Sequence, residues 1–370
     1  MKRLTSLVAL LVPTIVLAQG PPASPRMQPV PDGQWTDEQR MIVTEFAPSG
    51  MSNAIGTLLV NPPLARRVFT HDRYITREST LAPRHRALLG LRAAWLSRSN
   101  YLWAHRATIA RRDGLTDADL RRIAQGADAA GWDAFDATLL RAADELLVDS
   151  FIADATWKAL GARFDLPQMI DTIDTVAETT MYAGVFNSLG VQIEPGIIDR
   201  LPSGIPYTVN AKQTNLRVVG TPRIPPVDAP GGRGGGANVF RTFNRHPPAD
   251  RVRGAINTHV NSSNSLSSKQ RELLMTRIGV LCRSEYEYAA HLRLGRQAGF
   301  TDADVARVIN GPNSAPGDPL ETALLQSVDD LFANVAISAT TWATLAKSLN
   351  ERQLVDVLIT VGGYRSGSML

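Results

Sequence analysis

The sequence has few cysteines, few aromatic residues and little net charge. Its one cysteine, Cys282, can form neither an internal disulfide nor an intramolecular dithiol pair. Aromatic residues make up 6% of the 370 residues, and the formal net charge is +4. No run of Lys and Arg with interleaved aromatics occurs, so nothing indicates binding to nucleic acid. We expect the partner to be a small-molecule substrate.

Long apolar stretches are also lacking. The N-terminal stretch runs from Leu4 to Leu17 and is too short to span a bilayer. It follows Lys2 and Arg3 and ends on small residues, which is typical of a signal peptide over residues 1–19. Its removal would lower the net charge from +4 to about +2, because two basic residues leave with it. We predict an exported protein, periplasmic or secreted, that has no membrane anchor after cleavage.

What the sequence does contain is an internal repeat with a constant offset of 185 residues. Pro62-Pro63 returns as Pro247-Pro248, and Trp157 returns as Trp342. Longer matches join Arg86-x-Leu88-Leu89-x-x-Arg92 to Arg271-x-Leu273-Leu274-x-x-Arg277, and Gly114-x-Thr116-Asp117-Ala118-Asp119 to Gly299-x-Thr301-Asp302-Ala303-Asp304. Chance would not keep one register over so many matches, so the chain contains a duplicated domain.

The repeat defines the expected organisation of the chain. The first copy covers residues 35–194 and the second covers 238–370. Between them, residues 195–237 are rich in Pro and Gly and predict a linker. Because Leu370 corresponds to Val185 in the first copy, we expect the last helix of the second copy to be clipped.

The apolar residues of each copy recur at helical spacing, and no alternating strand pattern occurs. We therefore predict an all-α fold. In the second copy, capping residues and glycines place helices at about 269–282, 284–297, from 301 onward, 320–333, 340–348 and 351–362.

Polar residues that could carry chemistry gather near one helix junction of the second copy. Glu287 and His291 are four residues apart and share a helix face, which Ser284 also shares. A carboxylate one turn from an imidazole can raise its pKa and make an acid/base pair. Glu272, on the preceding helix, could supply a second carboxylate.

Each of these residues also has a purely structural interpretation. Ser284-x-x-Glu287 fits a capping box, which stabilises a helix start without any catalytic role. His291 could be a core histidine with satisfied hydrogen bonds, and Glu272 could be a solvated charge. Spacing alone does not decide between these interpretations and a catalytic site.

A family resemblance rests on two segments of the second copy that precede Gly299, namely Arg271-Glu-Leu-Leu-Met-Thr-Arg277 and Cys282-Arg-Ser-Glu-Tyr-Glu-Tyr-Ala-Ala-His291. They closely resemble the carboxymuconolactone decarboxylase family, whose all-helical fold is shared with the alkylhydroperoxidase proteins. The resemblance covers both copies. It implies decarboxylation of a carboxylated unsaturated lactone without a metal or organic cofactor, and domains that assemble into homo-oligomers.

The same resemblance implies roles for individual residues. His291 would donate and accept the proton, Glu287 would orient it, and Glu272 would relay the proton or position the site. Arg277 and Arg283 are candidates for binding the substrate carboxylate, because a guanidinium can bind it through two hydrogen bonds. Ser284 is a further candidate for substrate binding.

The peroxidase branch of this fold carries Cys-x-x-Cys between the Glu and the His. Here those two positions hold Ser284 and Glu287, and Cys282 lies two residues away. Dithiol peroxide reduction needs a thiolate and a resolving thiol, so the sequence disfavours it. A peroxidase that uses Cys282 with an external thiol, and a protein that binds a small molecule without turnover, stay open as alternatives.

The first copy serves as an internal comparison. The positions of Glu272, Glu287 and His291 hold Ala87, Leu102 and Arg106 there, so all three ionisable groups are replaced. Arg277 and Arg283, in contrast, keep arginine counterparts at Arg92 and Arg98, which favours structural roles for them. We therefore predict that the second copy carries the acid/base site and that the first copy is its scaffold.

Overall fold

The computed structural model describes residues 22–48, 52–207, 221–228 and 238–370. The predicted signal peptide and parts of the predicted linker lie outside these residues. Over the described residues the chain is all-helical and contains no strand, which confirms the predicted fold class. None of the helices described combines the length and the apolar character that crossing a membrane requires.

The first copy begins with α1 (Asp37–Phe46), which has no counterpart in the described part of the second copy. Its repeated helices are α2 (Asn53–Leu58), α3 (Pro62–Arg73), α4 (Pro83–Leu96), α5 (Asn100–Arg112), α6 (Asp117–Gln125), α7 (Ala134–Asp149), α8 (Asp154–Gly161) and α9 (Leu166–Leu189). The core consists of their apolar faces, and Leu88 and Leu89 of the repeated motif are fully buried in it.

The second copy repeats these helices, and each begins 185 residues after its counterpart. They are α10 (Asn238–Phe243), α11 (Pro247–Thr258), α12 (Ser268–Leu281), α13 (Glu285–Gln297), α14 (Asp302–Asn310), α15 (Pro319–Asn334), α16 (Ala339–Leu345) and α17 (Glu351–Met369). The predicted bounds hold within three residues except at the end of α17, which continues past the predicted residue 362.

The repeated sequence motifs explain the repeated local structure. Thr116 and Thr301 each form a capping box with the aspartate three residues later, which starts α6 and α14. Arg98 and Arg283 each adopt a positive φ, of 52° and 56°, at the junction between two consecutive helices. The sequence matches at these positions therefore record caps and turns that both copies need.

Two further features recur in both copies and were not predicted. A π-helical turn follows α3 at Tyr74–Glu78 and α11 at His259–Ser263. In the second copy, an oxygen of Asp356 accepts a hydrogen bond from the backbone N–H of Ser265 at 2.7 Å, and the other lies 2.7 Å from His259 Nε2. Asp171 holds the corresponding segment of the first copy through Thr80 and Tyr74. These aspartates fix the chain after each π-helical turn.

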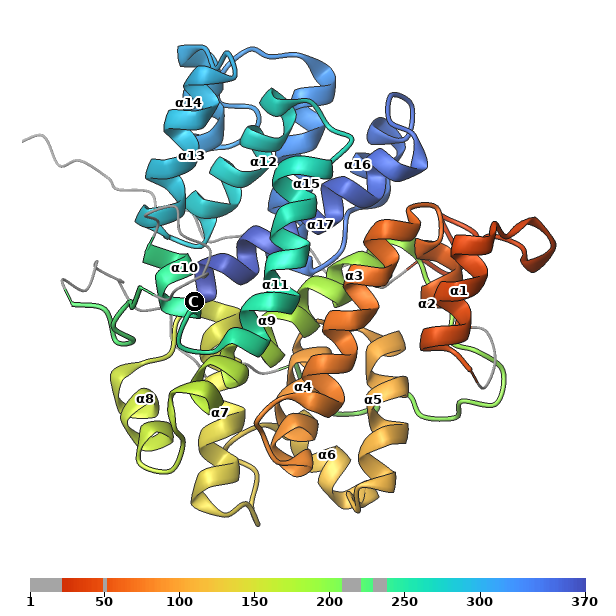
Figure 1. Ribbon diagram of the computed structural model, residues 1–370, viewed down its shortest axis with the longest axis vertical. Coiled ribbons are helices and arrows are strands. Elements are labelled where there is room, and N and C mark those ends of the chain that lie inside the picture. Colours follow the sequence, from red (N-terminus) through yellow and green to blue (C-terminus); the bar gives the residue numbers. More distant parts are fainter. Residues whose placement is uncertain (1–21, 49–51, 208–220, 229–237) are drawn as a thin grey trace, which may run out of the picture.

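The two copies pack together through their last helices. In Figure 1, α9 and α17 cross the middle of the molecule, with α4–α8 on one side and α12–α16 on the other. Gly362 of α17 allows the close approach, because a Cβ there would lie 2.4 Å from Cγ of Met181 on α9. α3 and α11 also pack against each other across this junction. The cavity described below lies beside it.

Candidate active site

His291 is buried between two carboxylates. Its Nδ1 lies 2.8 Å from Glu272 Oε2, and its Nε2 lies 3.5 Å from Glu287 Oε2. Glu287 and His291 are one turn apart on α13, whereas Glu272 reaches them from α12. All three side chains are at most 11% exposed. The structure therefore brings together the three residues predicted to form the acid/base group.

The two carboxylates determine the charge of His291. Burial alone would lower the pKa of the imidazole, because it disfavours the charged form. The hydrogen bonds and the negative charges of Glu272 and Glu287 outweigh burial and raise the pKa to about 9. At neutral pH the ring is therefore an imidazolium, which can donate a proton.

Neighbouring side chains fix the position of the imidazole ring. Ser284 caps α13 by accepting a hydrogen bond from the backbone N–H of Glu287. The ring of Tyr364 on α17 packs edge-on against His291, with 4.5 Å between the ring centroids. The hydroxyl of Tyr364 donates a hydrogen bond to Asn261 at 3.1 Å, which holds the tyrosine in place.

His291 and Glu287 open onto a cavity of about 410 Å³. Its wall is largely apolar and aromatic, and includes Phe240, Phe243, Ile256, Val260, Tyr286 and Leu294. Glu272 does not line this cavity, so it contacts the imidazole of His291 on the side away from the cavity. The sequence analysis gave the orienting role to Glu287, whereas Glu272 makes the shorter contact with the imidazole.

The first copy has a different residue at the position of His291. Arg106 stands where His291 stands in the second copy, and its guanidinium lies 3.2 Å from Asp72. The space lined by Ala87 and Arg106 measures about 20 Å³. The first copy therefore lacks the acid/base residues, and the space beside Arg106 is too small for a ligand.

Comparison with known protein families finds a match in each copy. Residues 62–145 and 247–330 match the carboxymuconolactone decarboxylase family. The chain contains two carboxymuconolactone decarboxylase family domains. The second match includes Glu272, Glu287 and His291, and the first covers the equivalent positions without these groups. A search of curated proteins finds no match to this chain.

The structure does not place Arg277 in the site, which corrects its predicted role in substrate binding. Its guanidinium is bonded to Asp329 and to the carbonyls of Val308 and Ile309, and it lines neither cavity beside His291. In the first domain, Arg92 makes the same bonds to the residues at the same offset, Asp144, Ile123 and Ala124. The repeated arginine therefore joins three helices of each family domain.

Arg283 and Ser284 line a second cavity, of about 700 Å³, that adjoins the first. The guanidinium of Arg283 lies 2.6 Å from Asp149 of the first domain. Cys282 lines the same cavity but is only 4% exposed, and burial raises the pKa of its thiol. Glu287 lies between the two cavities and contributes to both walls. Substrate binding by Arg283 and Ser284 therefore stays a prediction that concerns the second cavity.

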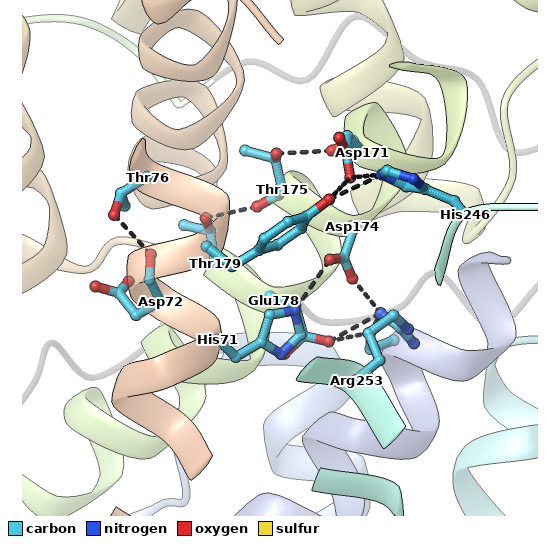
Figure 2. Close-up of polar contacts among 12 residues, drawn as sticks. His71, Asp72, Thr76, Asp171, Asp174, Thr175, Glu178, Thr179, His246 and Arg253 are labelled. Carbon is cyan, nitrogen blue, oxygen red and sulfur yellow. Dashed lines mark hydrogen bonds and ion pairs between the residues drawn. The ribbon is translucent and has the colours of Figure 1, made fainter. Parts of the chain in front are cut away.

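A buried polar cluster at the junction of the two domains was missed by the sequence analysis (Figure 2). His71 Nε2 lies 2.9 Å from Asp174, and His71 Nδ1 lies 3.4 Å from Glu178. Arg253, from the second domain, donates to both carboxylates. Glu178 and Arg253 also line the cavity of His291. The first domain therefore supplies part of the cavity wall and is more than the scaffold that was predicted.

This cluster also contains the group of described residues best placed to hold a metal ion. One ligand atom each from His71, Asp174 and Glu178 lies within 4.8 Å of the others. The guanidinium of Arg253 already bonds both carboxylates, so a dication would have to displace it or share these oxygens with it. The arrangement fits a bound guanidinium better than a metal ion.

A sequence signal for the cluster did exist. At the equivalent positions of the other copy, His71, Asp174 and Glu178 are replaced by Ile256, Ile359 and Gly363, and Arg253 is replaced by Val68. Polar residues at positions that are apolar or small in the other copy indicate a buried polar group present only once. The comparison of copies that singled out His291 could have been applied to these helices.

Proposed function

We propose that the second domain catalyses decarboxylation, or a related proton transfer, on a carboxylated lactone or a similar small acid, without a cofactor. The observation that carries this proposal is the buried imidazolium of His291, held by two carboxylates at the wall of a cavity of about 410 Å³. The cavity is large enough for a single small ring compound. Membership of the carboxymuconolactone decarboxylase family supports the choice of reaction.

In the proposed reaction, the bond between the substrate carboxylate and its ring carbon breaks and carbon dioxide leaves. The electron pair of that bond moves into the lactone as an enolate. His291 then donates a proton to carbon, which converts the enolate to the product. Glu272 keeps the imidazolium oriented, and Glu287, at the boundary of both cavities, is placed to return a proton to His291.

The cysteine chemistry of related folds is disfavoured in this chain. Cys282 is buried, and its raised pKa keeps it as a thiol rather than a nucleophilic thiolate. The chain has no second cysteine to resolve an oxidised intermediate. Peroxide reduction by this protein would therefore need both an opening of the structure around Cys282 and an external thiol.

Two variants test the proposal against these alternatives. Purified wild type, His291→Gln and Cys282→Ser are assayed for carbon dioxide release from a panel of carboxylated unsaturated lactones and for consumption of organic hydroperoxides. We expect His291→Gln to lose about 100-fold or more of the decarboxylase rate, because an acid/base group contributes about that factor. Cys282→Ser should keep it.

His105→Gln provides the matched control. His105 lies on α5, next to the position equivalent to His291, and also pairs with a carboxylate, Glu194 at 2.7 Å. This variant should keep full activity. Loss of turnover in Cys282→Ser alone would contradict the proposal in favour of a peroxidase. A wild type that turns over neither class of compound would point to a binding protein.

A further inference from the structure

One edge of the Arg253 guanidinium has no partner among the described residues. Nη1 makes all of its hydrogen bonds, to Asp174, to Glu178 at 3.0 Å and to Ser366 at 2.9 Å. Nε and Nη2 donate to none of the residues that the structure describes. The guanidinium also packs over the ring of Phe243, with its carbon 5.1 Å from the ring centroid. Arg253 is thus held firmly while two adjacent N–H groups remain available.

Arg253 lies in the wall of the cavity beside His291, where a ligand could reach this edge. Arg253 lines the same cavity as Glu287 and His291, and its side chain is 11% exposed. Phe243 also lines the cavity, so the aromatic contact that orients the guanidinium forms part of the wall. A planar pair of N–H donors in an otherwise largely apolar cavity matches the two oxygens of a carboxylate.

We propose that the Nε–Nη2 edge of Arg253 binds a carboxylate of the ligand, and that Asp174 and Glu178 of the first domain hold the guanidinium in position for it. The site is then shared between the two domains. The second domain supplies the acid/base residues and the anchor, and the first domain supplies the carboxylates that position the anchor. This assignment deepens the proposed function and rests on the same cavity.

The charges of the cluster permit an anion to bind there. Asp174 and Glu178 carry two negative charges, and Arg253 carries one positive charge. His71 lies between both carboxylates, and although burial alone would lower its pKa, their charges raise it, which favours the imidazolium form. With His71 as an imidazolium, two cations balance two anions, and a ligand carboxylate would meet a neutral cluster whose Nε–Nη2 edge has no partner among the described residues. Asp250 and Glu287 in the wall oppose the ligand charge, and protonated His291 offsets one of them.

The anchored carboxylate should be one that the substrate retains. A carboxylate that leaves as carbon dioxide loses its charge in the transition state, so an ion pair with it would stabilise the ground state more than the transition state. An ion pair with a second, unreactive carboxylate stabilises both states equally and serves to position the ring.

The test separates anchoring from catalysis by using an unreactive ligand. 5-Oxotetrahydrofuran-2-carboxylate and its methyl ester differ in charge and in one methyl group, and neither should react. Their affinities for the full-length protein are measured by isothermal titration calorimetry. We expect the wild type to bind the acid at least about 10-fold more tightly than the ester, because of a charge-assisted pair of hydrogen bonds. Arg253→Lys should reduce this ratio by about 5-fold or more, because lysine lacks the planar fork.

A matched control comes from the first domain. Arg106 is also a buried arginine paired with an aspartate, but it lies in the first domain, beside a space of only about 20 Å³. Arg106→Lys should keep the wild-type ratio. If Arg253→Lys does not fold, as judged by circular dichroism, Arg253→Gln replaces it, because its amide can still bond Asp174 or Glu178 and lacks the charge.

Each outcome bears on the proposal. An acid-to-ester ratio near one in the wild type, or an unchanged ratio in a folded Arg253 variant, would overturn it. Loss of acid binding after treatment with EDTA would also overturn it, because a metal ion at His71, Asp174 and Glu178 would then hold the carboxylate. Acid binding that depends on Arg253 in a protein with no decarboxylase activity would support the anchor and refute the proposed function.

Discussion

The protonation of His291 can be tested by removing the carboxylate that orients it. In Glu272→Gln the contact at 2.8 Å loses its negative charge, and Glu287 at 3.5 Å remains. The difference between the ordinary pKa of 6.5 and about 9 corresponds to about 3 kcal/mol in favour of the imidazolium. Burial opposes that preference, so the two carboxylates together supply more than this. We expect the variant's pKa to fall by about 1–2 pH units, towards 7.

The assay is a proton NMR titration of the histidine Cε1–H signals. The chain has six histidines, and His291→Gln identifies the signal of interest by its loss. In the wild type the midpoint should lie near pH 9, and in Glu272→Gln it should lie well below that value. A wild-type midpoint at or below pH 7 would refute the reasoning, because burial would then have outweighed the two carboxylates.

The same shift makes a prediction about stability. The pKa of His291 is higher in the folded than in the unfolded protein, so its contribution is complete below about pH 6.5 and is lost as pH rises through about 9. Urea unfolding of wild type and His291→Gln should therefore show a difference in unfolding free energy that shrinks by up to about 3 kcal/mol across this window. A difference that stays constant from pH 6 to 9.5 would contradict the assignment. The proposed decarboxylase activity should fall only as pH rises through about 9, because the folded protein loses its proton donor there.

Two other changes test the positions of residues around the site. Arg277→Leu should lower the free energy of unfolding by about 3 kcal/mol, because it leaves Asp329 and the carbonyls of Val308 and Ile309 without their partner. Ligand affinity of the folded variant should be unchanged in calorimetry, and a selective loss of affinity would restore its predicted role in binding. Gly279→Ala places a Cβ 3.1 Å from the backbone N of Tyr288 and 3.3 Å from Cβ of Glu287, so α13 must move away from α12. We expect a cost of about 1–2 kcal/mol in urea unfolding and a lower pKa of His291, and an unaltered titration would show that the junction accommodates the methyl group.

The fold was predictable because its determinants are local and occur twice. Capping boxes at Thr116 and Thr301, and prolines at the start of α3 and α11, mark helix starts in the sequence itself. The end of α17 was not predictable in this way. Gly362-Gly363 is typical of a helix end, yet the helix continues because Gly362 is needed where α17 meets Met181 of α9. A contact between domains overrides the local preference there.

In the candidate site, too, the residues that are close in sequence were predicted and those brought together by domain packing were not. Glu287 and His291 are one turn apart, so spacing alone placed them together. Glu272 lies on the preceding helix, and the family resemblance implied that it belongs to the same site. Neither helical spacing nor the family resemblance indicated the cluster around Arg253, and only the comparison of the two copies could have pointed to it. Its members come from α3, α9 and α11 and are up to 182 residues apart, from His71 to Arg253. Only the packing of the two domains brings them to one cavity.

The composition of this cluster explains why the two domains are not interchangeable. A pair of first domains packed in the same way would place Val68 where Arg253 stands, and would leave Asp174 and Glu178 buried without the guanidinium. A pair of second domains would bury Arg253 against Ile359 and Gly363, without either carboxylate. Both arrangements carry uncompensated buried charge, which costs several kcal/mol. One domain of each kind is therefore needed. The first domain lacks the acid/base groups but has Asp174 and Glu178, two carboxylates that the second domain lacks.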